Sequence, residues 1–141
     1  MLLRRAFSIH RVQTKANLGT TIELIVAAHG PGTQWLTQQR EGAVIDVLAP
    51  LGRPFVLPKE PVACAIVAGG YVAAPMMSLA EELRTRGCRI DVVLGASTET
   101  KLFGVLDLKR IADSIAVTTD DGSYGVQGRV TDVLPNVIKR A

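Results

Sequence analysis

The sequence predicts two unlike parts: a small antiparallel sheet or part of a β-barrel, followed by an α/β lobe built on a parallel sheet. Two observations lead to this prediction. The first third of the chain contains short, β-branched, partly alternating segments between turn signals, which are typical of half-buried strands. Beyond residue 61, apolar strands alternate with helical patterns, and this order is typical of parallel sheets with right-handed crossovers.

In the first third we expect three strands, each bounded by glycine or asparagine turn signals. These strands cover residues 6–12, 20–27 and 43–48. Between the second and the third, a glycine-rich turn opens one short helix over residues 33–39, with Trp35 and Leu36 facing inward.

Four prolines between residues 50 and 61 mark the boundary between the two parts. Proline fixes φ and lacks an amide donor, so regular structure is disfavoured there. We therefore expect a first domain over residues 1–57, a linker over 58–61 and a second domain over 62–141.

The second part is expected to contain three strands and two helices. The strands cover residues 62–68, 89–95 and 114–118, and the helices cover residues 75–86 and about 101–111. In the first helix Met76, Leu79 and Leu83 share one face, and Gly87 ends the helix. We expect residues 62–134 to form the parallel-sheet lobe.

Composition excludes several classes of protein. With 141 residues, 48% of them apolar, the chain can bury a core, but no apolar run approaches the roughly 20 residues of a membrane helix. The N-terminus is unlike a secretory signal, so we expect a cytoplasmic protein with no membrane partner. The net charge of +3 is scattered and aromatic residues make up only 4%, so no nucleic-acid partner is expected.

Three segments are candidates for ligand binding. Gly69 and Gly70 join a strand to a helix, where exposed backbone amides can bind a phosphate; a plain tight turn is the alternative. Thr33 stands at the start of the short helix, where its hydroxyl can bind a phosphate or only cap the helix. Polar residues 118–125 follow a strand directly, which fits a ligand crevice or an ordinary loop.

No catalytic or metal-binding constellation is expected. His10 and His29 have no Ser, Cys or Asp partner at motif spacing, which argues against a hydrolytic triad. Cys64 and Cys88 are isolated in sequence, with no C-x-x-C pair, so free thiols are expected.

Taken in order, these segments resemble the ferredoxin-NADP reductase superfamily. Within it, the resemblance is to the electron-transfer subunits of the dihydroorotate dehydrogenase B type and to alpha-type subunits of ferredoxin-NADP reductase. Residues 5–8 are similar to the R-x-[YF]-[ST] flavin motif, and residues 50–55 to the PLG-x-x-F linker. Residues 67–75 are similar to the nicotinamide-nucleotide turn, and residues 118–125 to the TTDDGS-x-G segment.

The resemblance implies FAD and NAD(P)H as cofactors and electron transfer between them. In that family Arg5 would meet an FAD phosphate, while Phe7 and Ser8 would lie along the isoalloxazine. The remaining flavin contacts would be Ile25, Val26, Ala27, Gly32 and Thr33. The nucleotide phosphates would lie at Gly69 and Gly70, with Asp120 and Asp121 lining the nicotinamide crevice.

The resemblance also implies that the first domain is a partial FAD-binding β-barrel and the second an NAD-binding lobe. We expect a chain truncated at both ends, which does not itself carry the [2Fe-2S] cluster of the full-length family. The expected partner is a catalytic oxidoreductase subunit, in an oligomer or hetero-complex. The alternatives are a non-catalytic nucleotide-binding or subunit-docking fragment, and a ligand-free structural domain.

Overall fold

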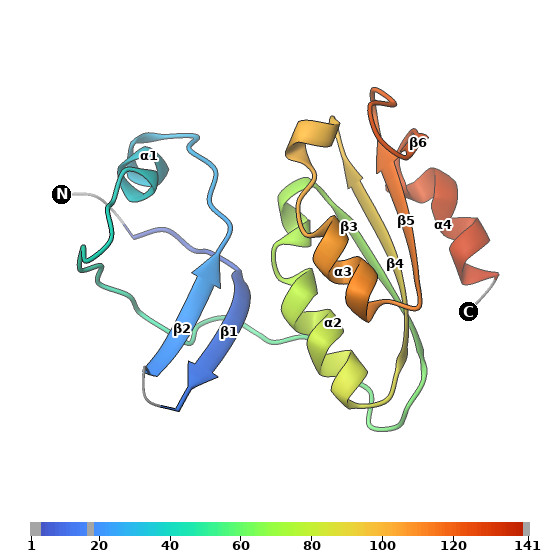
Figure 1. The fold of residues 1–141 in the computed structure, drawn as a ribbon, viewed down its shortest axis with the longest axis horizontal. Helices are drawn as coiled ribbons and strands as arrows, with labels where there is room; N and C mark the ends of the chain where they lie inside the picture. Colours follow the sequence, from blue (N-terminus) through green and yellow to red (C-terminus); the bar gives the residue numbers. More distant parts are fainter. Residues whose placement is uncertain (1–3, 17–18, 140–141) are drawn as a thin grey trace.

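Two separate sheets make up the fold in the computed structural model, which describes residues 4–16 and 19–139 (Figure 1). An antiparallel hairpin of β1 (Ile9–Lys15) and β2 (Gly19–Leu24) is followed by α1 (Pro31–Thr37). The second sheet has four parallel strands in the order β3-β4-β5-β6. The predicted fold class, an antiparallel sheet followed by a parallel α/β lobe, is confirmed.

Three strands and two helices of the second lobe agree closely with the predicted elements. Its strands are β3 (Ala63–Gly69), β4 (Arg89–Ala96), β5 (Ser114–Thr119) and β6 (Val126–Gln127). Its helices are η1 (Gly70–Ala73), α2 (Met76–Thr85), η2 (Glu99–Lys101), α3 (Val105–Ile111) and α4 (Val130–Ile138). Among the described residues, no helix combines the length and the apolar character that crossing a membrane requires. The sequence prediction included neither β6 nor α4.

Helices cover both faces of the parallel sheet, because side chains alternate along β4. Ile90, Val92 and Leu94 pack with α2 and α3 in the main apolar cluster. The intervening positions face the other way, and Gly95 there lies against Val130 of α4. The core of the molecule therefore lies in this three-layered lobe.

The first lobe has no core of its own within its described part. No described residue between 4 and 62 is fully buried. The expected strand over residues 43–48 is wrong: the segment is irregular, and Val44 is 96% exposed. The strands β1 and β2 pair only with each other, so this segment has no neighbouring strand to complete a ladder. Trp35, expected to face inward, is 43% exposed for the same lack of a covering layer.

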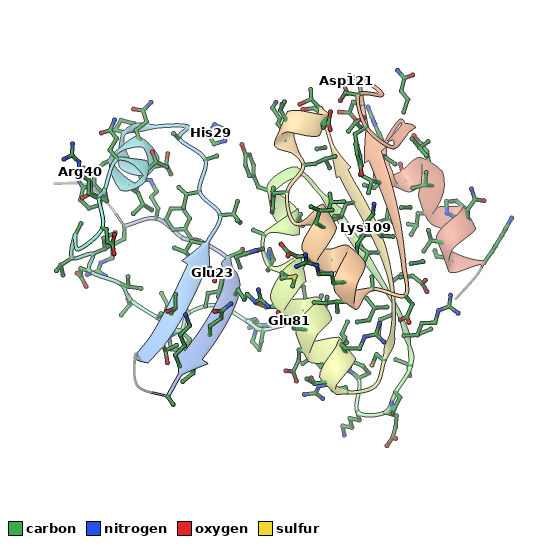
Figure 2. The ribbon with its side chains drawn as sticks, viewed as in Figure 1. Glu23, His29, Arg40, Glu81, Lys109 and Asp121 are labelled. Carbon is green, nitrogen blue, oxygen red and sulfur yellow. The ribbon has the colours of Figure 1, made fainter. Side chains whose placement is uncertain are left out.

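The hairpin is held in place by α2 of the second lobe. His10 Nδ1 donates a hydrogen bond to the carbonyl oxygen of Ala74 at 2.6 Å, and Ser78 Oγ donates to the His10 carbonyl at 2.6 Å. Arg11 forms an ion pair with Glu81, which Figure 2 shows on the side of α2 nearest the hairpin. These contacts join residues more than 60 positions apart in sequence.

The contact between Gly95 and α4 leads to a stability prediction. A Cβ on Gly95 would lie 2.5 Å from Val130 Cγ1 and 2.8 Å from Thr118 Oγ1, so Gly95→Ala should overpack this site and cost about 1–3 kcal/mol in the free energy of unfolding. Urea denaturation measures the change. Gly69→Ala is the control, because a Cβ there meets nothing within 4 Å. If both variants are equally stable, the close packing of α4 on β4 is not as described.

Candidate functional site

A cleft of about 320 Å³ opens where the carboxyl ends of β3, β4 and β5 meet. Gly69 and Gly70 form one wall, and Asp120, just after β5, lies in the same cleft. Arg129 and Val130 contribute from the start of α4. Ligands of open α/β sheets bind at this edge, outside the carboxyl ends of the strands. The structure thus brings the expected nucleotide turn and Asp120 together.

The glycine turn leaves open space above it. Gly69 has extended backbone angles, φ −121° and ψ 134°, whereas Gly70 has φ +57°, which favours glycine. A Cβ built on either residue would meet no protein atom within 4 Å. A ligand can therefore approach the backbone here closely.

The floor of the cleft contains a buried hydroxyl that lacks a hydrogen-bond partner. Thr118 is 1% exposed, and its Oγ1 has no hydrogen bond within the part of the chain that the structure describes. It lines the cleft beside Gly95, where a larger residue would collide with it. A buried hydroxyl with no partner is costly, so Thr118 carries an unused hydrogen-bonding group at the floor of the cleft.

The two neighbouring aspartates have different environments. Asp121 Oδ1 accepts hydrogen bonds from the Ser123 hydroxyl at 2.6 Å and from the Ser123 N–H at 3.0 Å. The hydroxyl bond, followed by the amide bond, holds the pKa of the Asp121 carboxyl below its ordinary value. Figure 2 shows Asp121 at the outer tip of the loop beyond β5. Asp120 lines the cleft, whereas the carboxylate of Asp121 closes its own loop.

Two of the expected flavin segments adjoin the open end of the hairpin, opposite the turn between β1 and β2. Ile9 pairs with Leu24 at the end of the β1–β2 ladder, so Ser8 and Ile25 leave it at the same place. Neither Phe7 nor residues 25–27 belong to a strand, because the ladder ends before them. These segments are therefore irregular extensions of the two strands.

The start of α1 brings Arg5 and Gly32 together. A Cβ on Gly32 would lie 3.8 Å from Cγ and Nε of Arg5, so the guanidinium lies directly over this glycine. The Thr33 hydroxyl accepts hydrogen bonds from the His29 and Gly30 amides and donates to the Gly30 carbonyl. Its hydrogen-bonding capacity is used within the turn, as the capping interpretation of Thr33 predicts.

The expected flavin and nucleotide segments touch at one ring contact. His29, two residues after the flavin segment that ends at Ala27, meets Tyr71, the residue after Gly70. Their rings are 5.4 Å apart between centroids and cross at 84°. Figure 2 shows His29 on the side of the first lobe that faces the second. The two candidate cofactor segments therefore lie next to each other.

Known proteins share this sequence and fold. No protein-family model matches the chain. The dihydroorotate dehydrogenase B (NAD(+)) electron transfer subunits of Desulforamulus reducens and Geobacillus thermodenitrificans are 35% and 38% identical over 94% of this chain. A solved structure of an NADH-dependent reduced ferredoxin-NADP oxidoreductase, described for flavin-based electron bifurcation, matches 96% of this chain with a TM-score of 0.79 and 32% identity. The chain is therefore similar in sequence and in fold to proteins of the ferredoxin-NADP reductase type. It spans about half the length of the relatives that it matches, 50% and 51% of the two subunits and 48% of the solved chain.

Sequence reasoning missed two groups in the cleft, Arg129 and the Thr118 hydroxyl. Arg129 was missed because it precedes α4, a helix whose β-branched residues and internal Pro135 hide the helical pattern. The acidic residue at the third helical position, Asp132, was the available signal, since its side chain caps the Arg129 N–H. Thr118 belongs to the candidate segment 118–125, but nothing in the sequence distinguishes its hydroxyl from that of Thr119.

The open space over the turn leads to a binding prediction. Gly69→Val should fold normally, because the extended backbone there suits a β-branched residue. Its side chain should enter the cleft and weaken ADP binding by about tenfold or more, as overpacking of an occupied site does. Calorimetric titration measures the affinity.

Gly30→Val is the matched control for Gly69→Val, since Gly30 is also extended and has open space around it but does not line the cleft. Gly70→Val is a poorer test, because φ +57° would strain valine with or without a ligand. Equal ADP affinity in Gly69→Val and the parent would mean that the turn only joins strand to helix.

The lowered pKa of Asp121 predicts how stability depends on pH. A carboxyl whose pKa is lower in the folded state stabilises the protein above its unfolded pKa, and this contribution disappears as the pH falls through the folded pKa. Asp121→Ala should therefore be less stable than the parent at neutral pH, with a difference that shrinks in acid. Thermal unfolding at a series of pH values measures both chains. A difference that stays constant into acid would show that the carboxylate charge contributes nothing.

Proposed function

We propose that this chain is the flavin- and nicotinamide-binding part of an electron-transfer subunit, and that it passes electrons between NAD(P)H and FAD. The observation that supports this most is the contact between His29 and Tyr71, which links the candidate flavin segment to the candidate nucleotide turn. Hydride transfer requires the nicotinamide and isoalloxazine rings to lie against each other, so the two sites must be neighbours.

The residues present fit a dinucleotide in the cleft. Open space over Gly69 and Gly70 admits a pyrophosphate, and the Thr118 hydroxyl offers an unused hydrogen bond below it. NAD(P)H, when bound, supplies two electrons as a hydride. Asp120 is proposed to line the nicotinamide crevice, while Asp121 shapes the loop that carries Asp120.

On the flavin side, the Arg5 guanidinium over Gly32 fits an FAD phosphate, because a planar cation binds phosphate oxygens with paired hydrogen bonds. Phe7 and Ser8 are proposed to lie along the isoalloxazine. The other proposed flavin contacts are Ile25, Val26, Ala27 and Thr33, the last through its backbone. FAD, when bound, accepts the hydride and can release its electrons singly.

The division into domains and the partner are also part of the proposal. Residues 1–57 are assigned to a partial flavin lobe, 58–61 to the linker and 62–141 to the nucleotide lobe; residues 1–3, 17–18 and 140–141 lie outside the described residues. Val44 and Val56 are almost fully exposed in the first lobe. We expect further protein, in a hetero-complex with a catalytic oxidoreductase subunit, to cover such apolar side chains.

A second candidate function is nucleotide binding without flavin chemistry. The described part of the first lobe contains no buried residue, and its regular structure is limited to β1, β2 and α1, so it does not by itself form an enclosed flavin site. A nucleotide-binding or subunit-docking module would keep the cleft and not the flavin.

Titration with FAD and then with NADH under anaerobic conditions distinguishes these functions. The proposed function predicts that FAD binds and that NADH bleaches its visible absorbance. Arg5→Gln should weaken FAD binding by roughly tenfold or more, as loss of a charge-assisted hydrogen bond does, with Arg110→Gln on α3 as control. Binding of ADP without FAD would favour the second candidate, and binding of neither would contradict both.

A further inference from the structure

We propose that Arg129 and Thr118 form an anion-binding subsite in the cleft, which holds a phosphate group of the bound nucleotide. This inference rests on the proposed nucleotide binding but not on the flavin chemistry. The phosphate is either part of the pyrophosphate or attached to the adenosine ribose, and the two have the same recognition chemistry. Arg129 lies at the start of α4, across the cleft from Gly69 and Gly70.

The Thr118 hydroxyl is the first argument for this subsite. Its neighbour Thr119 is also buried, but the Thr119 hydroxyl accepts a hydrogen bond from the Tyr124 amide and donates one to the Tyr124 carbonyl. Thr118, 1% exposed, has no such partner among the described residues. Thr118 lines the cleft, and its hydroxyl oxygen, itself buried, lies beside Gly95 and Val130 at the floor. Phosphate oxygens are acceptors, and in the proposed subsite a phosphate in the cleft accepts a hydrogen bond from this hydroxyl.

The Arg129 side chain is the second argument. Ion pairs with carboxylates occupy Arg4, Arg11, Arg84, Arg86, Arg89 and Arg110. Arg129 lines the cleft and has no ion pair within the described ranges, 4–16 and 19–139. The carboxylate nearest in sequence, Asp132, accepts the Arg129 backbone N–H at 2.7 Å as a helix cap. The guanidinium therefore remains available to an anion.

Helix polarity and local charge support the same assignment. The nine-residue helix α4 directs the positive end of its dipole toward the cleft, which favours an anion there. Asp120 adds a negative charge to the cleft, so a phosphate is retained only where Arg129 offsets it. Asp120 can instead accept hydrogen bonds from ribose hydroxyls, as acidic residues of dinucleotide sites do.

Calorimetric titration of the whole chain with three ligands tests the subsite: ADP, adenosine 2′,5′-bisphosphate and adenosine. Arg129→Gln should weaken binding of at least one phosphorylated ligand by roughly 10- to 100-fold and leave adenosine unchanged, as loss of a charged hydrogen bond predicts. An effect on ADP alone assigns the pyrophosphate. An effect on the bisphosphate alone, or a larger one on it, assigns a phosphate on the ribose.

Thr118→Val gives a second, independent readout. Valine has nearly the shape of threonine, so this variant should weaken phosphate binding by roughly 3- to 10-fold, the value of a single neutral hydrogen bond. Without ligand it should be at least as stable as the parent, because the hydroxyl has no partner to lose. Thr119→Val, which does lose partners, should be destabilised and is the matched control.

Arg110→Gln, an exposed position on α3, controls for the loss of one positive charge. The inference is overturned if Arg129→Gln binds every phosphorylated ligand as tightly as Arg110→Gln does, or if it loses adenosine equally. A parent chain that binds none of the three ligands overturns it together with the proposed nucleotide binding. Failure of FAD reduction with these affinities intact counts against the flavin role alone.

Discussion

The position of the first lobe depends on the contacts between β1 and α2. A hairpin with no buried residue is not held in one orientation by packing of its own. Here its orientation is fixed by the polar contacts of His10, Arg11 and Ser78 between the two lobes. Helix α2 begins shortly after the glycine turn, which is the candidate phosphate site. The helix that contacts the hairpin is therefore also next to this site in the chain. One element thus sets the distance between the two candidate cofactor segments.

Three strands and two helices of the parallel lobe, β3, β4, β5, α2 and α3, could be predicted to within a few residues because their signals are local. Apolar strands, a one-sided helix face and Gly87 after α2 all indicate the same fold, and the core that they form is internal to the lobe. Gly69, Gly70 and Asp120 meet in the cleft because the carboxyl ends of parallel strands share one edge. These three residues of the candidate nucleotide site could therefore be predicted from the strand order and the glycine turn.

The structure of the first lobe and the other residues of the cleft could not be predicted, because they depend on tertiary contacts that no local sequence pattern reveals. Residues 43–48 have the composition of a strand, but a strand forms only beside another, and the described chain provides none. Trp35 has the apolar side chain of an inward-facing residue, but no layer of the described structure covers it, and it stays exposed. The proposed roles of Arg129 and Thr118 depend on the absence of side-chain partners among the described residues, and this absence can be seen only in the folded chain.

The loop after β5 is already closed by its own hydrogen bonds, from Thr119 to Tyr124, from Ser123 to Asp121 and from the Glu99 amide to Ser123. A ligand arriving at this side of the cleft meets a surface that is already in its binding shape, so little conformational entropy is lost there. On the candidate flavin side, the turn at Thr33 is closed in the same way, whereas Phe7, Ser8 and residues 25–27 belong to no helix or strand. The proposed nucleotide site is therefore more preorganised than the proposed flavin site.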